Sequence, residues 1–377
     1  MGCKYLKRGI PIGLSFALGT MLLLGGCSGE MGEMQTGQIP EDMGFAAEAE
    51  DVNLVELDSS IVELEEGLFA VRYDGDYGFD GFIDQGGAFS DGEVIAYLAE
   101  NLLSGLNLGD LLGGVFGCST IAVQSPEGDA LFGRNFDWNT CEAMVVEARP
   151  ENGYASLSTV NMDFITQNVG DGMVGMALSL DEVRTLAALY APLDGMNEAG
   201  LAVSVNMIQD SAQIEQNTDK PDITTTTAIR LLLDRAGSVD EALELLGQYD
   251  LHGSMGMMIH FAIADSTGRS VAVEYVENEM LVTETPVLTN FYLAEGEKQG
   301  IGTEQSHERC NILTERLEES PEMGMDAVRD ALDSVSKDNF GEFESTEWSI
   351  VMNLSAGEAR YYHRENYERN YTFRLGE

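Results

Sequence analysis

The stretch Gly117-Cys118-Ser119-Thr120-Ile121-Ala122-Val123, followed by Leu131-Phe132-Gly133-Arg134-Asn135-Phe136-Asp137-Trp138, decides the fold. Residues 119–124 and 130–136 predict two strands, and the turn sequence Pro126-Glu127-Gly128-Asp129 joins them into a hairpin. The hairpin places Cys118 at a strand start and returns Arg134 and Asp137 beside it. Because side chains alternate along a strand, residues 134 and 137 would lie on opposite faces. We therefore expect a bend at Asn135–Phe136 that turns both toward the thiol.

Outward from this hairpin, strand and helix patterns alternate in blocks. Further strands are predicted at residues 143–147, 154–160, 201–207, 258–264, 270–276, 348–354 and 359–363. Helices are predicted at residues 93–112, 224–236, 238–248, 307–317 and 324–335. Blocks of strands separated by helices indicate an α+β protein whose sheets are covered by helices in layers.

The charge is strongly one-sided, with 20 Lys and Arg against 65 Asp and Glu and a formal net charge of −45. Binding to nucleic acid needs a basic face, so no nucleic-acid partner is expected. An excess of acidic residues is most simply explained by solubility. The 44% hydrophobic content is enough to form a core.

The N-terminus has the pattern of an export signal. Lys4, Lys7 and Arg8 precede an apolar run from Ile10 to Leu24, which is shorter than the roughly 20 residues of a membrane span. The run ends in Leu23-Leu24-Gly25-Gly26-Cys27, which resembles the lipobox of bacterial lipoproteins. We expect residues 1–27 to be a lipoprotein signal peptide with lipid on Cys27, and residues 28–50 to be a flexible tether. The alternative is an ordinary signal peptide or anchor helix.

The five cysteines are Cys3, Cys27, Cys118, Cys141 and Cys310. Outside the signal segment, three remain, so at least one thiol has no partner within the chain. A Cys141–Cys310 disulfide stays open. No cysteine pair has metal-ligand spacing and the four histidines are scattered, so no metal or cofactor is expected.

Several common catalytic and phosphate-binding motifs are missing from the sequence. It has no Gly-x-Ser-x-Gly elbow, no phosphate-binding Gly-x-x-x-x-Gly-Lys loop and no His-Glu-x-x-His. A papain-like Cys–His pair stays open, because its members need not be neighbours in sequence. His307 would be one partner, although it is better explained as a residue at a helix start.

With Cys118 and the Gly-Arg-Asn-x-Asp motif in place, residues 117–373 resemble the choloylglycine hydrolase and acid ceramidase group of linear-amide hydrolases. The resemblance includes Asn197-Glu198-Ala199-Gly200-Leu201, which leads to Asn206, and Val287-Leu288-Thr289-Asn290. It implies an N-terminal-nucleophile fold of four αββα layers. It also implies six catalytic residues: Cys118, Arg134, Asp137, Asn206, Asn290 and Arg309. Arg309 is the loosest match, because Arg316 lies on the same predicted helix.

The resemblance also implies how the site would form and work. The chain would be cut between Gly117 and Cys118, and the new α-amine of Cys118, with a reference pKa near ~8, would accept the thiol proton. Arg134 would favour the thiolate, Asp137 would orient the amine, and Asn206 would bind the oxyanion. Asn290 and Arg309 would hold the substrate and the amine. Gly117 would permit a strained turn and a close approach.

These expectations divide the chain into a helical pre-segment at 51–117 and a catalytic domain at 118–377. A long pre-segment is more typical of the acid ceramidase side of the group than of bile-salt hydrolases, so the resemblance implies an amidase of linear N-acyl amides, of the fatty-acyl amide or N-acyl amine type. From the lipobox-like sequence we expect this amidase to be lipid-anchored and extracytoplasmic. Cleavage of bile-salt or penicillin V amides, and a non-catalytic binding lipoprotein, are the alternatives. Acyl-pocket walls are expected from four aromatic residues, namely Phe116, Trp138, Phe164 and Phe291. The oligomeric state stays open.

Overall fold

The computed structural model describes residues 53–102, 117–166, 180–338 and 344–376. The predicted signal peptide, the tether and Phe116 lie outside these ranges. No helix in the described part of the chain is both long and apolar enough to cross a bilayer.

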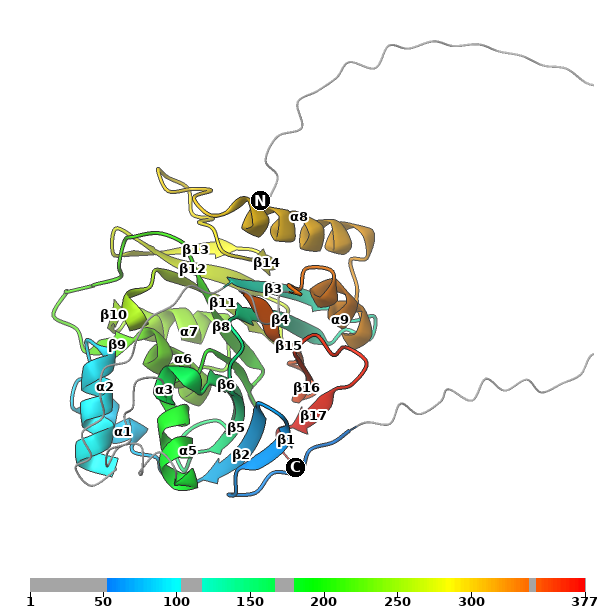
Figure 1. Cartoon of the computed structure of the whole chain (residues 1–377). Helices are drawn as coiled ribbons and strands as arrows, with labels where there is room; N and C mark the ends of the chain where they lie inside the picture. Colours follow the sequence, from blue (N-terminus) through cyan, green and yellow to red (C-terminus); the bar gives the residue numbers. More distant parts are fainter. Residues whose placement is uncertain (1–52, 103–116, 167–179, 339–343, 377) are drawn as a thin grey trace, which may run out of the picture. The chain divides into compact units, whose positions relative to one another are not determined.

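A large, mostly antiparallel sheet of nine strands occurs in the described residues, in the order β1-β2-β5-β6-β7-β8-β11-β12-β13 (Figure 1). Only β2 and β5 pair in parallel. The bounds of its strands are β1 Val62–Glu65, β2 Leu68–Asp74, β5 Ala143–Arg149, β6 Ser156–Asn161, β7 Asp194–Asn197, β8 Leu201–Met207, β11 Ile259–Asp265, β12 Ser270–Val276 and β13 Glu279–Glu284.

A second sheet has the order β14-β3-β4-β15-β16-β17 and is antiparallel throughout. Its strands are β3 Gly117–Gln124, β4 Ala130–Trp138, β14 Val287–Leu288, β15 Ser345–Asn353, β16 Glu358–His363 and β17 Tyr371–Arg374. A small parallel pair is formed by β9 Asp222–Thr224 and β10 Asp250–His252. The β3–β4 hairpin closes through a turn in which Ser125 Oγ accepts from the N–H groups of Glu127 and Asp129.

The two sheets pack face to face, and helices cover their outer faces. One apolar core contains Phe132 and Phe136 of β4 together with Val203 and Val205 of β8. On the nine-stranded sheet lie α5 Asp181–Leu189, α6 Thr225–Arg235 and α7 Val239–Leu246. On the other sheet lie α8 Glu304–Glu319 and α9 Met325–Asp333 (Figure 1). The predicted αββα order is therefore confirmed.

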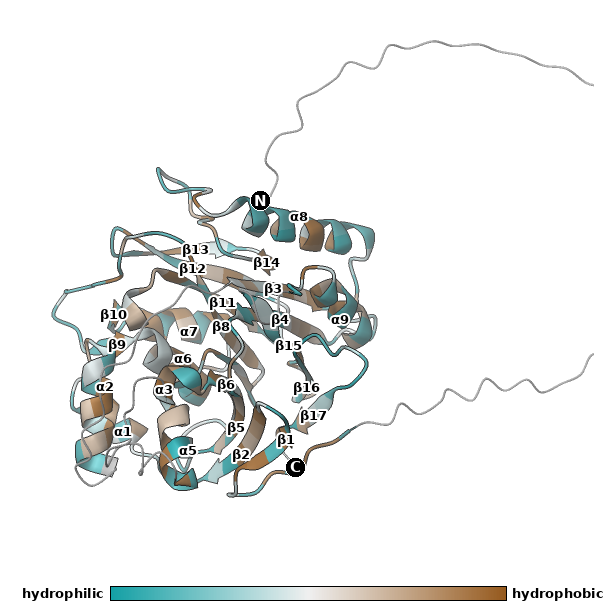
Figure 2. Ribbon diagram, in the orientation of Figure 1, coloured by the Kyte–Doolittle hydropathy of each residue, from teal (hydrophilic) through white to brown (hydrophobic). Residues whose placement is uncertain are grey.

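The helices of the outer layers follow amphipathic patterns with clear starts. Thr224 forms a reciprocal capping box with Thr227 at the start of α6, and Ser238 caps α7 by accepting from the N–H of Glu241. Most of α8 is hydrophilic (Figure 2), but its apolar residues Cys310 and Leu313 are buried against the six-stranded sheet. One face of each such helix therefore joins a core while the other meets solvent.

The pre-segment differs from the expected helical segment. It contains α1 Phe79–Asp84, α2 Asp91–Tyr97 and the π-helix η1 Leu98–Leu102, but β1 and β2 come first. Residues 62–65 and 68–74 form a hairpin around Gly67, whose φ of 83° needs a residue without Cβ. The helix predicted at 93–112 is confirmed over residues 93–102, where α2 ends at Tyr97 and the π-helix η1 continues it to Leu102. Its remainder, residues 103–112, lies outside the described ranges.

The short elements that complete the described chain are α3 Asp163–Thr166 and the 3₁₀ turn η2 Ser254–Gly256. Cys141 is a free, buried thiol, so the open Cys141–Cys310 disulfide does not form.

Candidate active site

Cys118 is the second residue of β3 and is fully buried. Its register partner on β4 is Phe136, so the two side chains share the face that packs against the nine-stranded sheet. The Sγ atom donates to the carbonyl of Val205 on β8 at 3.6 Å. Burial raises the pKa of this thiol to about 11, although Arg134 and Arg309 act to lower it. In the uncleaved chain the thiol is therefore protonated at neutral pH.

Arg134 lies on the same face of β4 as Phe136 and is also fully buried. Its Nε donates to Asp194 Oδ2 at 2.5 Å, and its Nη1 donates to Asn206 Oδ1 at 3.0 Å. The positive charge of the guanidinium acts to lower the pKa of the Cys118 thiol. Arg134 thus joins the thiol to β7 and β8 of the opposite sheet.

Asp137 lies on the other face of β4, toward α8 and α9. Its carboxylate accepts from Thr346 Oγ1 at 2.8 Å and lies 3.5 Å from both Arg309 Nη1 and Lys337 Nζ. The expected bend at Asn135–Phe136 is wrong, because β4 pairs with β3 in unbroken register from residue 130 to 137. The irregularity is a bulge in the partner strand β15, between Thr346 and Trp348. Only Arg134 faces the thiol, and Asp137 faces the opposite side of the strand.

Asn290 and Arg309 bind the backbone of Cys118 rather than its thiol. Asn290 Oδ1 accepts from the Cys118 N–H at 2.8 Å, and its Nδ2 donates to Met207 O at 2.7 Å. Arg309 Nη1 donates to Cys118 O at 2.6 Å, and Nη2 donates to Asn290 Oδ1 at 2.8 Å. Arg316 is exposed in the last turn of α8, so the structure brings Arg309 to the site and leaves Arg316 outside it.

Asn206 is buried in β8, next to the residue whose carbonyl accepts from the thiol. Its Oδ1 accepts from Arg134, and its Nδ2 donates weakly to Leu288 O and Thr289 O, each at 3.4 Å. Amide donors at 3.4 Å are held loosely, which leaves the group free to turn toward a developing oxyanion.

Gly117 is extended in β3 and lies opposite Asp137 in the register. The strained turn expected at this residue is wrong, because Gly117 is not among the glycines with positive φ. The close approach is present. A Cβ built on Gly117 would lie 2.6 Å from Lys337 Nζ and 2.9 Å from Asp137 Oδ2.

Two residues of this site, Asp194 and Lys337, were not singled out from the sequence. Asp194, which is fully buried, accepts from Arg134 and also from Trp348 Nε1 at 3.0 Å. Lys337 follows α9 and pairs with Asp137 and Glu344. Asp194 stands just before the Asn197-Glu198 turn, but no signal in the sequence predicts that it pairs with Arg134.

His307 is part of the first turn of α8, as expected for a residue near a helix start. Its Nε2 lies 2.9 Å from Gly300 O, and its ring centroid lies 4.0 Å from that of Phe291, with the two rings tilted by 31°. The charged groups that shift the pKa of Cys118 in the described structure are Arg134, Asp137 and Arg309. This arrangement gives the papain-like alternative no support.

Of the four aromatic residues expected to line an acyl pocket, Phe116 lies outside the described ranges, and Trp138, Phe164 and Phe291 are buried. Trp138 and Phe164 pack edge to face at 5.1 Å, and Phe291 packs against His307. Their contacts are those of core residues.

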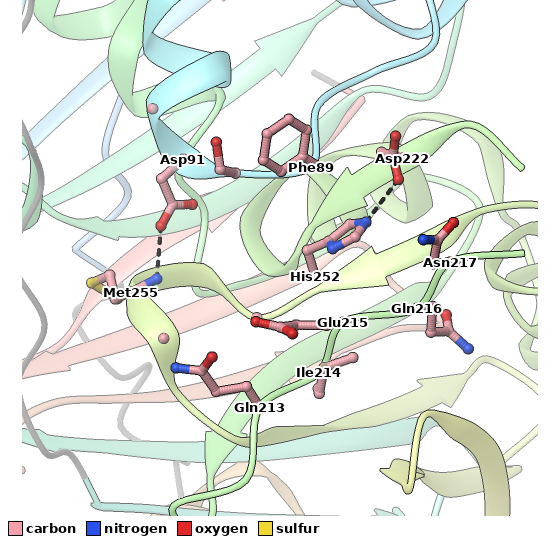
Figure 3. Close-up of a pocket in the computed structure, with 14 residues that line it drawn as sticks. Phe89, Asp91, Gln213, Ile214, Glu215, Gln216, Asn217, Asp222, His252 and Met255 are labelled. Carbon is pink, nitrogen blue, oxygen red and sulfur yellow. Dashed lines mark hydrogen bonds and ion pairs between the residues drawn. The ribbon is translucent and has the colours of Figure 1, made fainter. Parts of the chain in front are cut away.

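A separate pocket of about 830 Å³ lies between residues 89–92 of the pre-segment and residues 213–217 and 252–256 (Figure 3). His252 Nε2 lies 2.7 Å from Asp222 Oδ1 there, and Asp91 accepts from the N–H of Met255 at 2.7 Å. None of the six predicted catalytic residues lines this pocket. It is therefore distinct from the cysteine site.

Two facing sheets between helix layers, with a cysteine at the start of a central strand, define the N-terminal-nucleophile hydrolase fold. Residues 118–291 match the model of the linear amide C–N hydrolases, choloylglycine hydrolase family. The match begins at Cys118 itself. The family predicted from the sequence is thus confirmed, and it is a family of enzymes that act on C–N bonds in linear amides.

Three similar proteins illustrate the range of these matches. The bile salt hydrolase/transferase of Clostridium perfringens (strain 13 / Type A) is 27% identical over 183 residues, 46% of this chain and 53% of that protein. The chain therefore matches about half the length of that curated relative. A crystal structure of a mutant conjugated bile acid hydrolase from Clostridium perfringens has a TM-score of 0.51 at 18% identity, covering 68% of this chain and 92% of that one. The penicillin V acylase from Agrobacterium tumefaciens has a TM-score of 0.48 at 17% identity, covering 65% and 83%.

Proposed function

We propose that this protein is a cysteine amidase that hydrolyses linear N-acyl amides through a thioester on Cys118. The observation that carries the proposal is the hydrogen bond from the Cys118 N–H to Asn290 Oδ1 at 2.8 Å. That nitrogen becomes the α-amine if the chain is cut after Gly117. A site that binds this nitrogen with a carboxamide, while an arginine acts on the thiol, is arranged for a cysteine at a chain start.

Maturation begins with the thiol of Cys118 and the carbonyl of Gly117. The sulfur bonds to the carbonyl carbon, the Gly117–Cys118 C–N bond breaks, and the thiol proton moves to the nitrogen. Water then hydrolyses the thioester, which leaves a carboxylate on Gly117 and a free thiol and amine on Cys118. The uncleaved site supports this step because Arg309 and Asn290 already fix the backbone of Cys118.

In the mature enzyme, the neutral α-amine takes the thiol proton, and Arg134 stabilises the thiolate. The thiolate attacks the substrate carbonyl, and Asn206 donates to the resulting oxyanion, an interaction worth roughly 3 kcal/mol. The ammonium of Cys118 gives its proton to the leaving amine. Water then hydrolyses the acyl thioester, which releases the acid and restores the thiol.

The pre-segment would stay bound after cleavage as a small subunit. Strand β2 pairs with β5 from Leu68 to Asp74, and Phe82 of α1 is fully buried in the main core. Backbone pairing and apolar burial of this extent support a stable non-covalent association.

For the substrate, we propose a fatty-acyl or other N-acyl amine, released as acid and amine. The long pre-segment favours this class, whereas the 27% identity to a bile salt hydrolase/transferase favours a conjugated bile salt as the second candidate. The test is turnover of a fatty-acyl ethanolamide, a glycine-conjugated bile salt and penicillin V by the purified protein, with Cys118→Ala as the blank. Release of amine from the ethanolamide alone supports the first candidate, and release from the bile salt alone supports the second.

We also propose that the protein is extracytoplasmic and anchored to the bacterial membrane through lipid on Cys27. The lipobox-like sequence before Cys27 supports this. Cell fractionation tests it: the wild type should sediment with membranes, and Cys27→Ala should lose its lipid mass and leave the membrane fraction. A wild-type protein without added lipid mass would contradict the anchor.

A non-catalytic binding lipoprotein with this fold is the alternative from another class. Cys118→Ser separates the two. A binding protein would keep its ligand affinity and its single-chain form, whereas the amidase would lose turnover.

A further inference from the structure

We propose that Lys337 is a positioning residue for maturation: its ammonium neutralises Asp137 beside the bond that is cut, and so permits the thiol to attack Gly117. This inference rests on the self-cleavage proposed above. It concerns the face of β3 opposite the thiol, where Asp137 lies near Arg309 and Gly117.

Lys337 is tied to Asp137 through both its backbone and its side chain. It is 7% exposed, and its Nζ lies 3.5 Å from Asp137 Oδ2 and 2.5 Å from Glu344 Oε2. Its backbone N–H donates to Thr346 Oγ1 at 2.8 Å, and that hydroxyl donates to Asp137 Oδ1 at 2.8 Å. These contacts to two carboxylates and to the backbone fix the position of the Lys337 ammonium group.

The ammonium group lies beside Gly117, whose carbonyl the thiol must attack. A Cβ on Gly117 would come within 2.6 Å of Lys337 Nζ. The Cys118 N–H points to Asn290, on the β14 side of β3. The Gly117 carbonyl and the Cys118 N–H belong to one trans peptide unit, so they point in opposite directions. The Gly117 carbonyl therefore points to the β4 side, where Asp137 is its register partner.

The charge matters because attack by sulfur puts a negative charge on the Gly117 oxygen. A bare carboxylate beside a developing oxyanion raises the energy of the transition state, most strongly where water is excluded. Asp137 is fully buried, so water does not screen it. Lys337 and Arg309, each 3.5 Å from its Oδ2, supply the opposing positive charges.

The other charged groups around Lys337 and Asp137 are acidic. Glu344 pairs with Lys337 directly, and Glu365 lies near enough for Asp137 to act on it. Burial raises the pKa of Glu365, and the nearby Asp338, Asp137 and Asp333 also raise it. The hydrogen bond from Ser336 acts in the opposite direction. Removing Lys337 would therefore leave one arginine facing several carboxylates.

The test follows cleavage of the full chain after synthesis in vitro, using pulse-labelled wild type, Lys337→Met and Lys337→Arg at pH 5 to 8. Cleavage is read on gels and by intact mass, so no amide substrate is needed. We expect Lys337→Met to be cleaved at least about tenfold more slowly than the wild type at pH 7. Its rate should recover toward acid pH, where protonation of the carboxylates replaces the missing charge. Lys337→Arg should retain most of the wild-type rate.

Lys298→Met is the matched control, because Lys298 is also part-buried and paired with an aspartate, Asp210, outside this site. It should be cleaved like the wild type. A Lys337→Met chain cleaved as fast as the wild type would overturn the proposal. So would a slow Lys337→Met chain whose rate does not rise in acid, because packing alone would then explain it.

If Lys337→Met does not fold, Lys337→Gln and Lys337→Arg decide by the same pH comparison. A wild-type chain that is never cut would contradict the self-cleavage itself. A chain that is cut but does not hydrolyse amides would contradict only the proposed substrate class.

Discussion

The carboxamide oxygen of Asn290 accepts from the backbone N–H of Cys118 at 2.8 Å and from Arg309 Nη2 at 2.8 Å. One side chain thus joins the nitrogen that would become the nucleophile's amine to the cation that binds its carbonyl. In the proposed mechanism this carboxamide therefore serves both maturation and turnover.

Asn290→Ala should therefore slow both self-cleavage and amide hydrolysis by about 10²-fold, the usual effect of removing one positioned polar group. Intact mass over time measures the first, and amine release measures the second. Asn161→Ala is the control, because Asn161 is equally buried but lies in β6, where its Oδ1 accepts from the Asp163 N–H. Equal loss in both variants would point to general destabilisation.

The ion pair between Arg134 and Asp194 predicts a large effect on stability. Both side chains are fully buried, so Asp194→Ala would leave an unpaired buried guanidinium and should destabilise the fold by about 3–5 kcal/mol. Asp194→Asn, which can still accept a hydrogen bond, should cost less.

Urea unfolding measures this difference. The control is Asp240→Ala, which removes an exposed partner of Arg269 and should change the free energy of unfolding by less than about 1 kcal/mol. A similar midpoint for Asp194→Ala and Asp240→Ala would contradict the reading of Asp194 as the essential partner of Arg134.

A methyl group at position 117 should obstruct maturation. Gly117→Ala would place its Cβ within 3 Å of Lys337 Nζ and Asp137 Oδ2, so one or both must move from the scissile bond. We expect slower self-cleavage with little change in overall folding. Gly324→Ala, where a Cβ meets no atom within 4 Å, should be cleaved at the wild-type rate. Unchanged cleavage of Gly117→Ala would show that this close approach is not required.

The burial of His363, which pairs with Glu65, predicts how the free energy of unfolding varies with pH. Burial, aided by Arg364, lowers the pKa of His363 from 6.5 to about 4, although Glu65 acts to raise it. The folded state therefore resists protonation of His363 more than the unfolded state does. The stability it contributes is present above pH 6.5 and is lost as the pH falls toward 4.

His363→Gln should flatten this loss. The free energy of unfolding in urea, measured from pH 7 to 4.5, should fall less steeply for the variant than for the wild type. Identical slopes would contradict a buried, neutral His363. Because Glu65 belongs to β1, the same pair also joins the pre-segment to β16.

Strands in which apolar and polar side chains alternate, and which are bounded by turn residues, could be predicted from the sequence. Residues 201–207 and 270–276 have the same bounds in the structure as in the prediction. The hairpin of β1 and β2 was missed, although Val62-Glu-Leu-Glu alternates and Gly67 follows. Its parallel pairing with β5 depends on contacts across 75 residues of chain, a separation that local patterns do not report.

The candidate site divides in the same way. Cys118, Arg134 and Asp137 lie on one hairpin, so their proximity follows from local pairing. Strand alternation also places Arg134 and Asp137 on opposite faces, as the structure has them, whereas the expected bend is absent because β4 stays in register with β3. Asp194 and Lys337 could not be predicted, since which carboxylate or ammonium meets a buried partner depends on how the two sheets and α9 pack.

The central claim is that Cys118 becomes the first residue of a chain by cutting after Gly117. N-terminal sequencing with intact-mass measurement of the purified protein, beside Cys118→Ala, tests it most directly. We predict a second N-terminus that begins Cys118-Ser119-Thr120 in the wild type, and a single uncut chain in the variant. An intact wild-type chain that still hydrolyses amides would contradict it.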